Sequence, residues 1–182
     1  MQNDEWREPR TEWHTKWQAD FSPNMRHCDR LRNGHVADVI TDGGVVIQLQ
    51  GCYISEEEIL EREECYGRDM VWIFNCREAW KDFDYDPETQ LSTWWRYWPR
   101  VIFPKARVLL DVADDVGILN MWYFKKDGAF IEFRAHEIPK QNILAACQGQ
   151  PLPKSLYWSF RTRIGDSVLD EPNQSLRVRV RK

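Results

Sequence analysis

The apolar run at residues 70–74, MVWIF, is the sequence feature that most constrains the fold. Polar residues, Asp69 and Asn75, bound it on both sides. Its short length and its lack of alternation predict a strand that is buried on both faces. Such a strand lies inside a covered sheet. A chain of 182 residues that is 42% hydrophobic and 13% aromatic can bury the core that this requires, as one domain with elaborations.

The elements before this run are predicted in the order helix, three strands, helix. Thr11 is a predicted N-cap for a helix from residue 12 to 20, and Ser55 with the three glutamates after it predicts a second helix that continues to about Tyr66. Between the helices, turn residues separate three strand-like segments, at 25–31, 35–40 and 45–49. A strand that rejoins a sheet after a helix usually pairs in parallel, so the sequence predicts an α/β fold with a mixed sheet.

The second half of the chain is predicted to extend this core. Residues 82–93 are rich in loop-forming residues, and they precede three predicted strands and a short helix, at 107–111, 118–124, 129–133 and 139–147. We expect a domain at residues 1–150, with its core at about 11–76 and a strand-rich extension at 77–150, followed by a basic tail at 151–182.

Charge and composition limit the partners that the chain can have. The net charge is −4, so no global positive field attracts nucleic acid, and contact with DNA must come from local patches. Residues 94–100 interleave aromatic residues with Arg96 and Arg100, a pattern suited either to stacking on unpaired bases or to core packing. Arg177 and Arg179 share one face of the tail if it is extended, where they could track phosphates or remain solvated.

The cysteines and the hydropathy pattern indicate the compartment. The five cysteines have no structural-zinc spacing, and neither a signal peptide nor an apolar run of membrane-spanning length is present. We expect a cytoplasmic protein with free thiols and no membrane contact. The aromatic second half also suggests a surface for a protein partner or a second copy of the chain.

Three polar side chains are predicted to meet at one edge of the sheet. Asp38 ends one predicted strand, while Gln48 and Gln50 lie two residues apart on the next and therefore share a face. Polar groups in a buried strand pair need partners. The three residues are therefore either hydrogen-bonding groups that cap the sheet or part of a functional site.

A series of short motifs runs from the first helix to the apolar strand: Glu12-Trp-His14, His35-Val-Ala-Asp38-Val, Val46-Ile-Gln48-Leu-Gln50, Ile54-Ser55, Glu58, Arg62, Tyr66 and Val71-Trp72-Ile-Phe-Asn75. In this order they resemble the signature of the competence protein CoiA-like family. The resemblance covers roughly residues 11–76, and several motifs in one order make it fairly specific.

The resemblance implies a restriction-endonuclease-like PD-(D/E)XK fold with an αβββαβ core, and hydrolysis of DNA with Mg²⁺ or Mn²⁺. It implies that Asp38 and the residue at position 48 bind the metal and that Gln50, in place of the usual lysine, positions water or phosphate. Glu12 is implied to bind the metal directly or through water. His14 is implied to orient a phosphate or a water. The alternatives are a solvated carboxylate at Glu12 and a packed histidine at His14.

Two residues of the second helix and two positions after the third strand also belong to the resemblance. Arg62 and Tyr66 lie four residues apart, and they are implied either to contact the DNA backbone or to brace the metal site; an ordinary stack of Tyr on Arg is the alternative. Gly51 and Cys52 stand where relatives often carry His or Cys and then Ser, so a polar contact is expected to be weaker here.

Gln48 departs from the family pattern, which has glutamate at this position. An amide oxygen brings no formal charge, so metal affinity and cleavage rate are expected to fall steeply. The chain is then either a weakened nuclease or a non-catalytic module that binds nucleic acid or a protein partner. Gln48 is either a natural loss or a near-isosteric replacement made to trap an inactive protein, and the otherwise intact signature favours the replacement.

Overall fold

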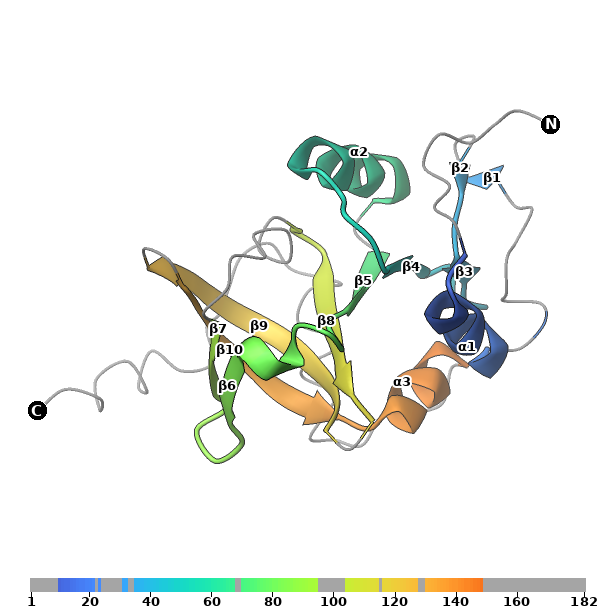
Figure 1. Ribbon diagram of the computed structural model, residues 1–182. Helices are drawn as coiled ribbons and strands as arrows, with labels where there is room; N and C mark the ends of the chain where they lie inside the picture. The colour runs from blue at the N-terminus through green and yellow to red at the C-terminus, as the bar shows by residue number, and fades with distance from the viewer. Residues whose placement is uncertain are drawn as a thin grey trace, which may run out of the picture.

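The fold is known from a computed structural model, which describes residues 10–21, 23, 31–32, 35–67, 70–94, 104–114, 116–127 and 130–148 (Figure 1). Within these ranges the helical elements are α1 (Glu12–Asp20), α2 (Glu56–Tyr66), the short 3-10 helix η1 (Trp80–Asp82) and α3 (Lys140–Cys147). The strands are β1 (Leu31–Arg32), β2 (His35–Val36), β3 (Val39–Ile40), β4 (Val46–Gln50), β5 (Met70–Asn75), β6 (Phe83–Asp86), β7 (Leu91–Trp94), β8 (Arg107–Ala113), β9 (Gly117–Asp127) and β10 (Phe130–Ile138).

One mixed sheet of eight strands organises the molecule, in the order β3-β4-β5-β8-β9-β10-β7-β6. The pairs β4/β5 and β5/β8 are parallel, whereas the other pairs in the sheet are antiparallel. Strands β1 and β2 form a separate antiparallel pair. The predicted α/β class with a mixed sheet is therefore confirmed, and the apolar strand β5 pairs in parallel with its neighbours, as expected; these are β4 and β8.

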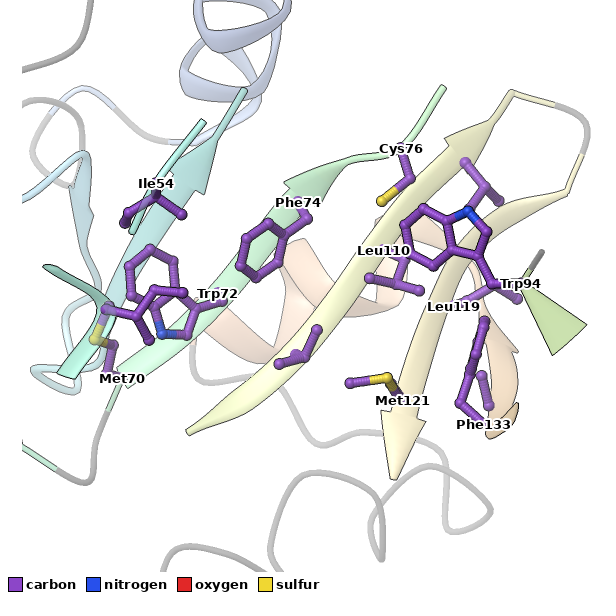
Figure 2. Packing of buried hydrophobic residues seen from close by; sticks show 14 of the residues in the cluster. Ile54, Met70, Trp72, Phe74, Cys76, Trp94, Leu110, Leu119, Met121 and Phe133 are labelled. Carbon is purple, nitrogen blue, oxygen red and sulfur yellow. The ribbon is translucent and has the colours of Figure 1, made fainter. Parts of the chain in front are cut away.

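Strand β5 separates two hydrophobic clusters, as expected for a strand that is buried on both faces. Trp72 and Phe74 belong to the α2-side cluster, which also receives Ile59 from α2 and the aromatic residues of the distal strands (Figure 2). Val71 and Ile73 point to the opposite face and pack in the cluster formed with α1 and α3. One strand thus serves both cores.

The helix starts agree with the predicted caps. The Thr11 side chain accepts the backbone N–H of His14 at 3.3 Å, and the Ser55 side chain accepts that of Glu58 at 3.1 Å. Helices α1 and α3 lie side by side (Figure 1), joined by an ion pair between Lys140 and Asp20 at 2.6 Å. No helix in the described ranges is long and apolar enough to cross a membrane.

Two predicted segments differ in the structure. The single strand predicted at 35–40 is broken at Ala37 and Asp38 into β2 and β3. Residues 82–93, predicted as loop, form the β6/β7 hairpin, because Phe83 and Tyr85 turn toward the core while the acidic residues between and after them face solvent. The later strands are also longer than predicted.

Part of the sequence prediction falls outside the described residues. Of the strand predicted at 25–31, only Leu31 is described, in β1. Arg96 and Arg100, like Arg177 and Arg179 in the tail, lie outside the described ranges. The described aromatic side chains of the distal strands are not exposed: Phe83 stacks on Trp94 with ring centroids 4.2 Å apart and packs edge-on against Phe133.

Candidate active site

The break between β2 and β3 places Asp38 beside strand β4. Strand β3 pairs with β4 only at Val39↔Ile47 and Ile40↔Val46, so the ladder ends before Leu49. The backbone N–H of Leu49 instead donates to Asp38 Oδ2 at 2.8 Å. A carboxylate therefore takes the position that a neighbouring strand would fill, which satisfies a backbone donor at the sheet edge.

His14 satisfies the other backbone group of Leu49. Its Nε2 lies 2.7 Å from the Leu49 carbonyl oxygen, and its Nδ1 lies 2.8 Å from the Thr11 hydroxyl oxygen. A carbonyl oxygen can only accept, so Nε2 carries a proton. The ring is buried and also packs closely over Gly51, where an added Cβ would lie 2.9 Å from His14 Cε1. His14 thus fastens α1 to the end of β4.

Burial and nearby positive groups have opposite effects on the pKa of the Asp38 carboxyl. Burial raises the pKa of the Asp38 carboxyl above its ordinary value, against the hydrogen bond from Leu49 and the charges of His14, Arg62 and Arg10, which lower it. Gln18, one helical turn after His14, donates through Nε2 to the Asp38 carbonyl at 3.2 Å. Helix α1 therefore contacts the backbone of Asp38, and positive charges from both α1 and α2 act on its carboxyl group.

Gln48 and Gln50 are buried on the α2 side of β4, the shared face that the alternation predicted. Gln48 Oε1 accepts from Arg62 Nη1 at 3.3 Å, and the second terminal nitrogen of Arg62, Nη2, pairs with Glu58. Gln50 Nε2 donates to the carbonyl oxygen of Cys52 at 3.1 Å. Both amides therefore have hydrogen-bond partners inside the protein.

Arg62 and Tyr66 are both buried. The Arg62 guanidinium carbon lies 6.0 Å from the centroid of the Trp72 ring, and Tyr66 packs in the α2-side cluster. The roles expected for these two residues were contact with the DNA backbone, bracing of the metal site, or a stack of Tyr on Arg. The structure places Arg62 against the side chain of Gln48. Contact with a DNA backbone would require both side chains to leave these positions.

Glu12 is not brought to the other candidate residues. Its side chain is 83% exposed and pairs with Lys16, one turn along α1, at 2.9 Å. This is the solvated first-turn carboxylate that was the alternative for this position.

The residues that the structure brings together at the candidate site do not fit a divalent cation. In the described part of the chain, no three His, Cys, Asp or Glu residues form a group that could hold a metal ion. Asp38 supplies one carboxylate, while the Gln48 oxygen is neutral and faces the Arg62 guanidinium. Mg²⁺ and Mn²⁺ favour oxygen ligands, preferably anionic ones, and a neighbouring guanidinium opposes a second cation.

A second polar cluster anchors α1 near the carboxyl end of β8, and the sequence analysis missed it. The indole nitrogens of Trp13 and Trp17 donate to Asp111 Oδ2 at 2.8 and 2.7 Å, and Arg77 Nε donates to Oδ1 at 3.1 Å. We call this set the Asp111 cluster. A lone aspartate inside an apolar strand was the available signal, because a buried carboxylate needs donors.

Gln18 and Arg10, which also act on Asp38, were not predicted, and Glu58, which pairs with Arg62, was given no role. The spacing of four between Glu58 and Arg62, and between His14 and Gln18, was the signal for them, because such pairs share a helix face. Arg10 has no comparable signal, since it precedes the helix.

The chain matches no protein-family model, no curated protein and no solved structure.

Proposed function

We propose that this chain is a DNA nuclease domain of the CoiA-like type whose metal-dependent hydrolysis is disabled at residue 48. The order of elements supports the proposal. Helix α1, the strands around Asp38, β4, α2 and β5 follow one another as in the αβββαβ core that the resemblance implies, with β3/β4 antiparallel and β4/β5 parallel.

The convergence of Asp38 with the Gln48 strand is the observation that carries the proposal. The carboxylate of Asp38 is bonded to the backbone of Leu49, the residue between Gln48 and Gln50. The resemblance implies metal ligands at these positions, with an aspartate that opens the site and two polar side chains on one face of the next strand. Asp38 and a carboxylate at residue 48 would hold a divalent cation, which would supply an activated water and neutralise charge on the phosphate.

Residue 48 is the position at which an anionic metal ligand is missing. A glutamate there would add the second carboxylate, and it would lie beside a guanidinium that already contacts the side chain at this position. Because Glu and Gln are nearly isosteric and the new carboxylate could accept from the same Arg62 nitrogen that contacts Gln48, the Gln48→Glu variant should fold.

The test is a cleavage assay of the wild-type chain and the Gln48→Glu variant on linear, circular and single-stranded DNA with Mg²⁺, Mn²⁺ or EDTA. We expect cleavage by the variant alone, and none in EDTA. Gln50→Glu is the matched control, since it adds the same charge to the same strand face two residues away and should not cut. Adding Asp38→Asn to Gln48→Glu should abolish the recovered cleavage. A folded Gln48→Glu variant that cuts no substrate would contradict the proposal.

A second candidate function is nucleic-acid binding without catalysis. The hydrogen bond from Arg62 to Gln48 favours it, because the position of the lost carboxylate is closed by a contact within the protein. The same two proteins distinguish the candidates: a binding module holds DNA in EDTA, with affinity that falls as salt increases, and it gains no cleavage from Gln48→Glu. Absence of binding at low salt would exclude the second candidate.

A further inference from the structure

The loop between β4 and α2 presents an exposed aromatic side chain next to the candidate site. Tyr53 is 69% exposed, and Tyr53 and Leu60 are the two exposed large hydrophobic residues among those described. Tyr53 is separated from Gln50 by only two residues. A single exposed apolar residue is ordinary on a protein surface, but Tyr53 lies in a loop that is held on both sides.

The backbone on both sides of Tyr53 is fixed by buried groups. Before it, the side chain of Gln50 holds the Cys52 carbonyl at 3.1 Å, and Gly51 lies so close to the His14 ring that no larger residue fits without a shift. After it, Ile54 is buried in the α2-side cluster and Ser55 caps α2. The polar side chain that the family pattern assigns to catalysis, Gln50, thus also positions the loop that exposes the ring.

We propose that Tyr53 is a stacking platform for an unpaired nucleobase of a nucleic-acid strand whose backbone passes the Asp38 edge of the sheet. This inference rests on the proposed function, and it names the substrate class as single-stranded DNA or unpaired ends. A base inside a duplex has both faces covered by its neighbours, whereas an unpaired base offers a face to an aromatic ring.

Charges around the loop determine the direction that such a strand takes. Glu56 and Glu57, exposed in the first turn of α2, repel phosphate on one side of Tyr53. The end of β4, which precedes Tyr53 in the chain, contacts the Asp38 carboxyl through Leu49, and the exposed Arg10 adds a positive charge near that carboxyl. The backbone of a strand with a base on Tyr53 is therefore directed along the end of β4 and away from α2.

The test measures affinity of the full chain for fluorescently labelled oligonucleotides in EDTA at low salt. The probes are a single strand, a strand of the same length that is abasic throughout, and a duplex closed at both ends by non-nucleotide linkers. Replacing Tyr53 by Ala should weaken binding of the intact single strand by about 5- to 150-fold, and Tyr53→Phe should bind within about twofold of wild type, because the ring is retained. Leu60→Ala is the matched control, an exposed apolar truncation on α2, and should change nothing.

The abasic strand and the duplex separate stacking from other contacts. Wild type and Tyr53→Ala should bind each of them equally, since neither offers a free base to the ring. A 2-aminopurine in the single strand should lose fluorescence on binding to wild type and should keep it with Tyr53→Ala.

The contrary outcomes are distinct for the two proposals. A folded Tyr53→Ala variant that binds single strands as tightly as wild type overturns the stacking inference and leaves the proposed function intact. An equal loss of affinity for intact and abasic strands also overturns it, because the contact is then not with a base. If wild type binds no nucleic acid and Gln48→Glu cuts none, both proposals are overturned.

Discussion

Asp38 meets two demands with one side chain. Its Oδ2 accepts the hydrogen bond of the Leu49 N–H, which has no strand partner. Its carboxylate is also the one charged metal ligand that the proposed nuclease site retains. Burial raises the pKa of this carboxyl above 3.8, and the hydrogen bond and nearby cations offset this only in part. The charge on this partly buried side chain therefore has an energetic cost in the folded protein.

The raised pKa of Asp38 predicts a pH-dependent gain in stability for Asp38→Asn. Because the folded pKa lies above 3.8, the stability linked to the protonated form is fully present below that pH and is lost as pH rises through the raised value. Asparagine is uncharged and keeps an oxygen for Leu49. The variant should therefore have a larger free energy of unfolding than wild type at pH 7 and an equal one at pH 3, measured by urea denaturation.

Asp38→Ala is the control that isolates the hydrogen bond. It removes the charge and also the acceptor, which leaves the Leu49 N–H without its partner. It should be about 1–3 kcal/mol less stable than Asp38→Asn at the same pH. Equal stability of the two variants would show that this hydrogen bond contributes nothing, and a larger difference between Asn and wild type at pH 3 than at pH 7 would contradict the burial argument.

The candidate residues show what a sequence can predict at this scale. Alternation along β4 was sufficient to place Gln48 and Gln50 on one face, and a turn of few residues brought Asp38 to them. Glu12 and His14 were both expected at the site, yet residues two positions apart on a helix are rotated by about 200° from each other around its axis. With His14 turned inward, Glu12 points to solvent, and Lys16 pairs with it. Helix rotation depends on tertiary packing, which short motifs do not encode.

At the scale of elements, the position of α1 depends on the Asp111 cluster. Two indole N–H groups share Oδ2 of one buried carboxylate, and a guanidinium occupies Oδ1. The same helix carries His14, so the cluster also determines how His14 meets the end of β4. Removing the negative charge of Asp111 would leave the two indole N–H groups with a weaker hydrogen-bond acceptor.

Asp111→Asn should therefore be destabilising. Asparagine has a single acceptor oxygen, and its amide group would face N–H donors, so the free energy of unfolding should fall by about 2–5 kcal/mol. Asp114→Asn is the matched control: it removes the other carboxylate that pairs with Arg77, but its side chain is 89% exposed and the change should stay within about 0.5 kcal/mol. Equal effects in urea denaturation would show that the cluster does not anchor α1.

Elements with a local signal were predicted, and those without one were not. Helices α1 and α2 start at Thr11 and Ser55 because hydroxyl caps satisfy their first N–H groups. The β6/β7 hairpin was missed because Asp84 and Asp86 on its outer face resemble a polar loop, while only two inward aromatics mark β6. Inside the hairpin Phe83 stacks on Trp94, and the hairpin is held to the sheet by the pairing of β7 with β10, a contact between segments far apart in the sequence.

For the whole molecule, the two hydrophobic clusters share one sheet. Val71 and Ile73 of β5 pack with α1 and α3, while Trp72 and Phe74 pack with α2 and the distal strands. The sheet is continuous from β3 to β6. Loss of one cluster exposes one face of the strands that the other cluster needs, so the two faces should not unfold independently.

This continuity predicts a single unfolding transition that responds to substitutions on either face. Ile143→Ala in α3 and Ile59→Ala in α2 each truncate a buried side chain on opposite sides of the sheet, and each should lower the free energy of unfolding by about 2–5 kcal/mol. Tryptophan fluorescence and far-ultraviolet circular dichroism should give the same urea midpoint for each variant, because all probes follow one cooperative unit. If Ile143→Ala produced a separate early transition while the α2 face stayed folded, the helices α1 and α3 would form a unit of their own, and the effect of the Asp111 cluster on the candidate site would then be local.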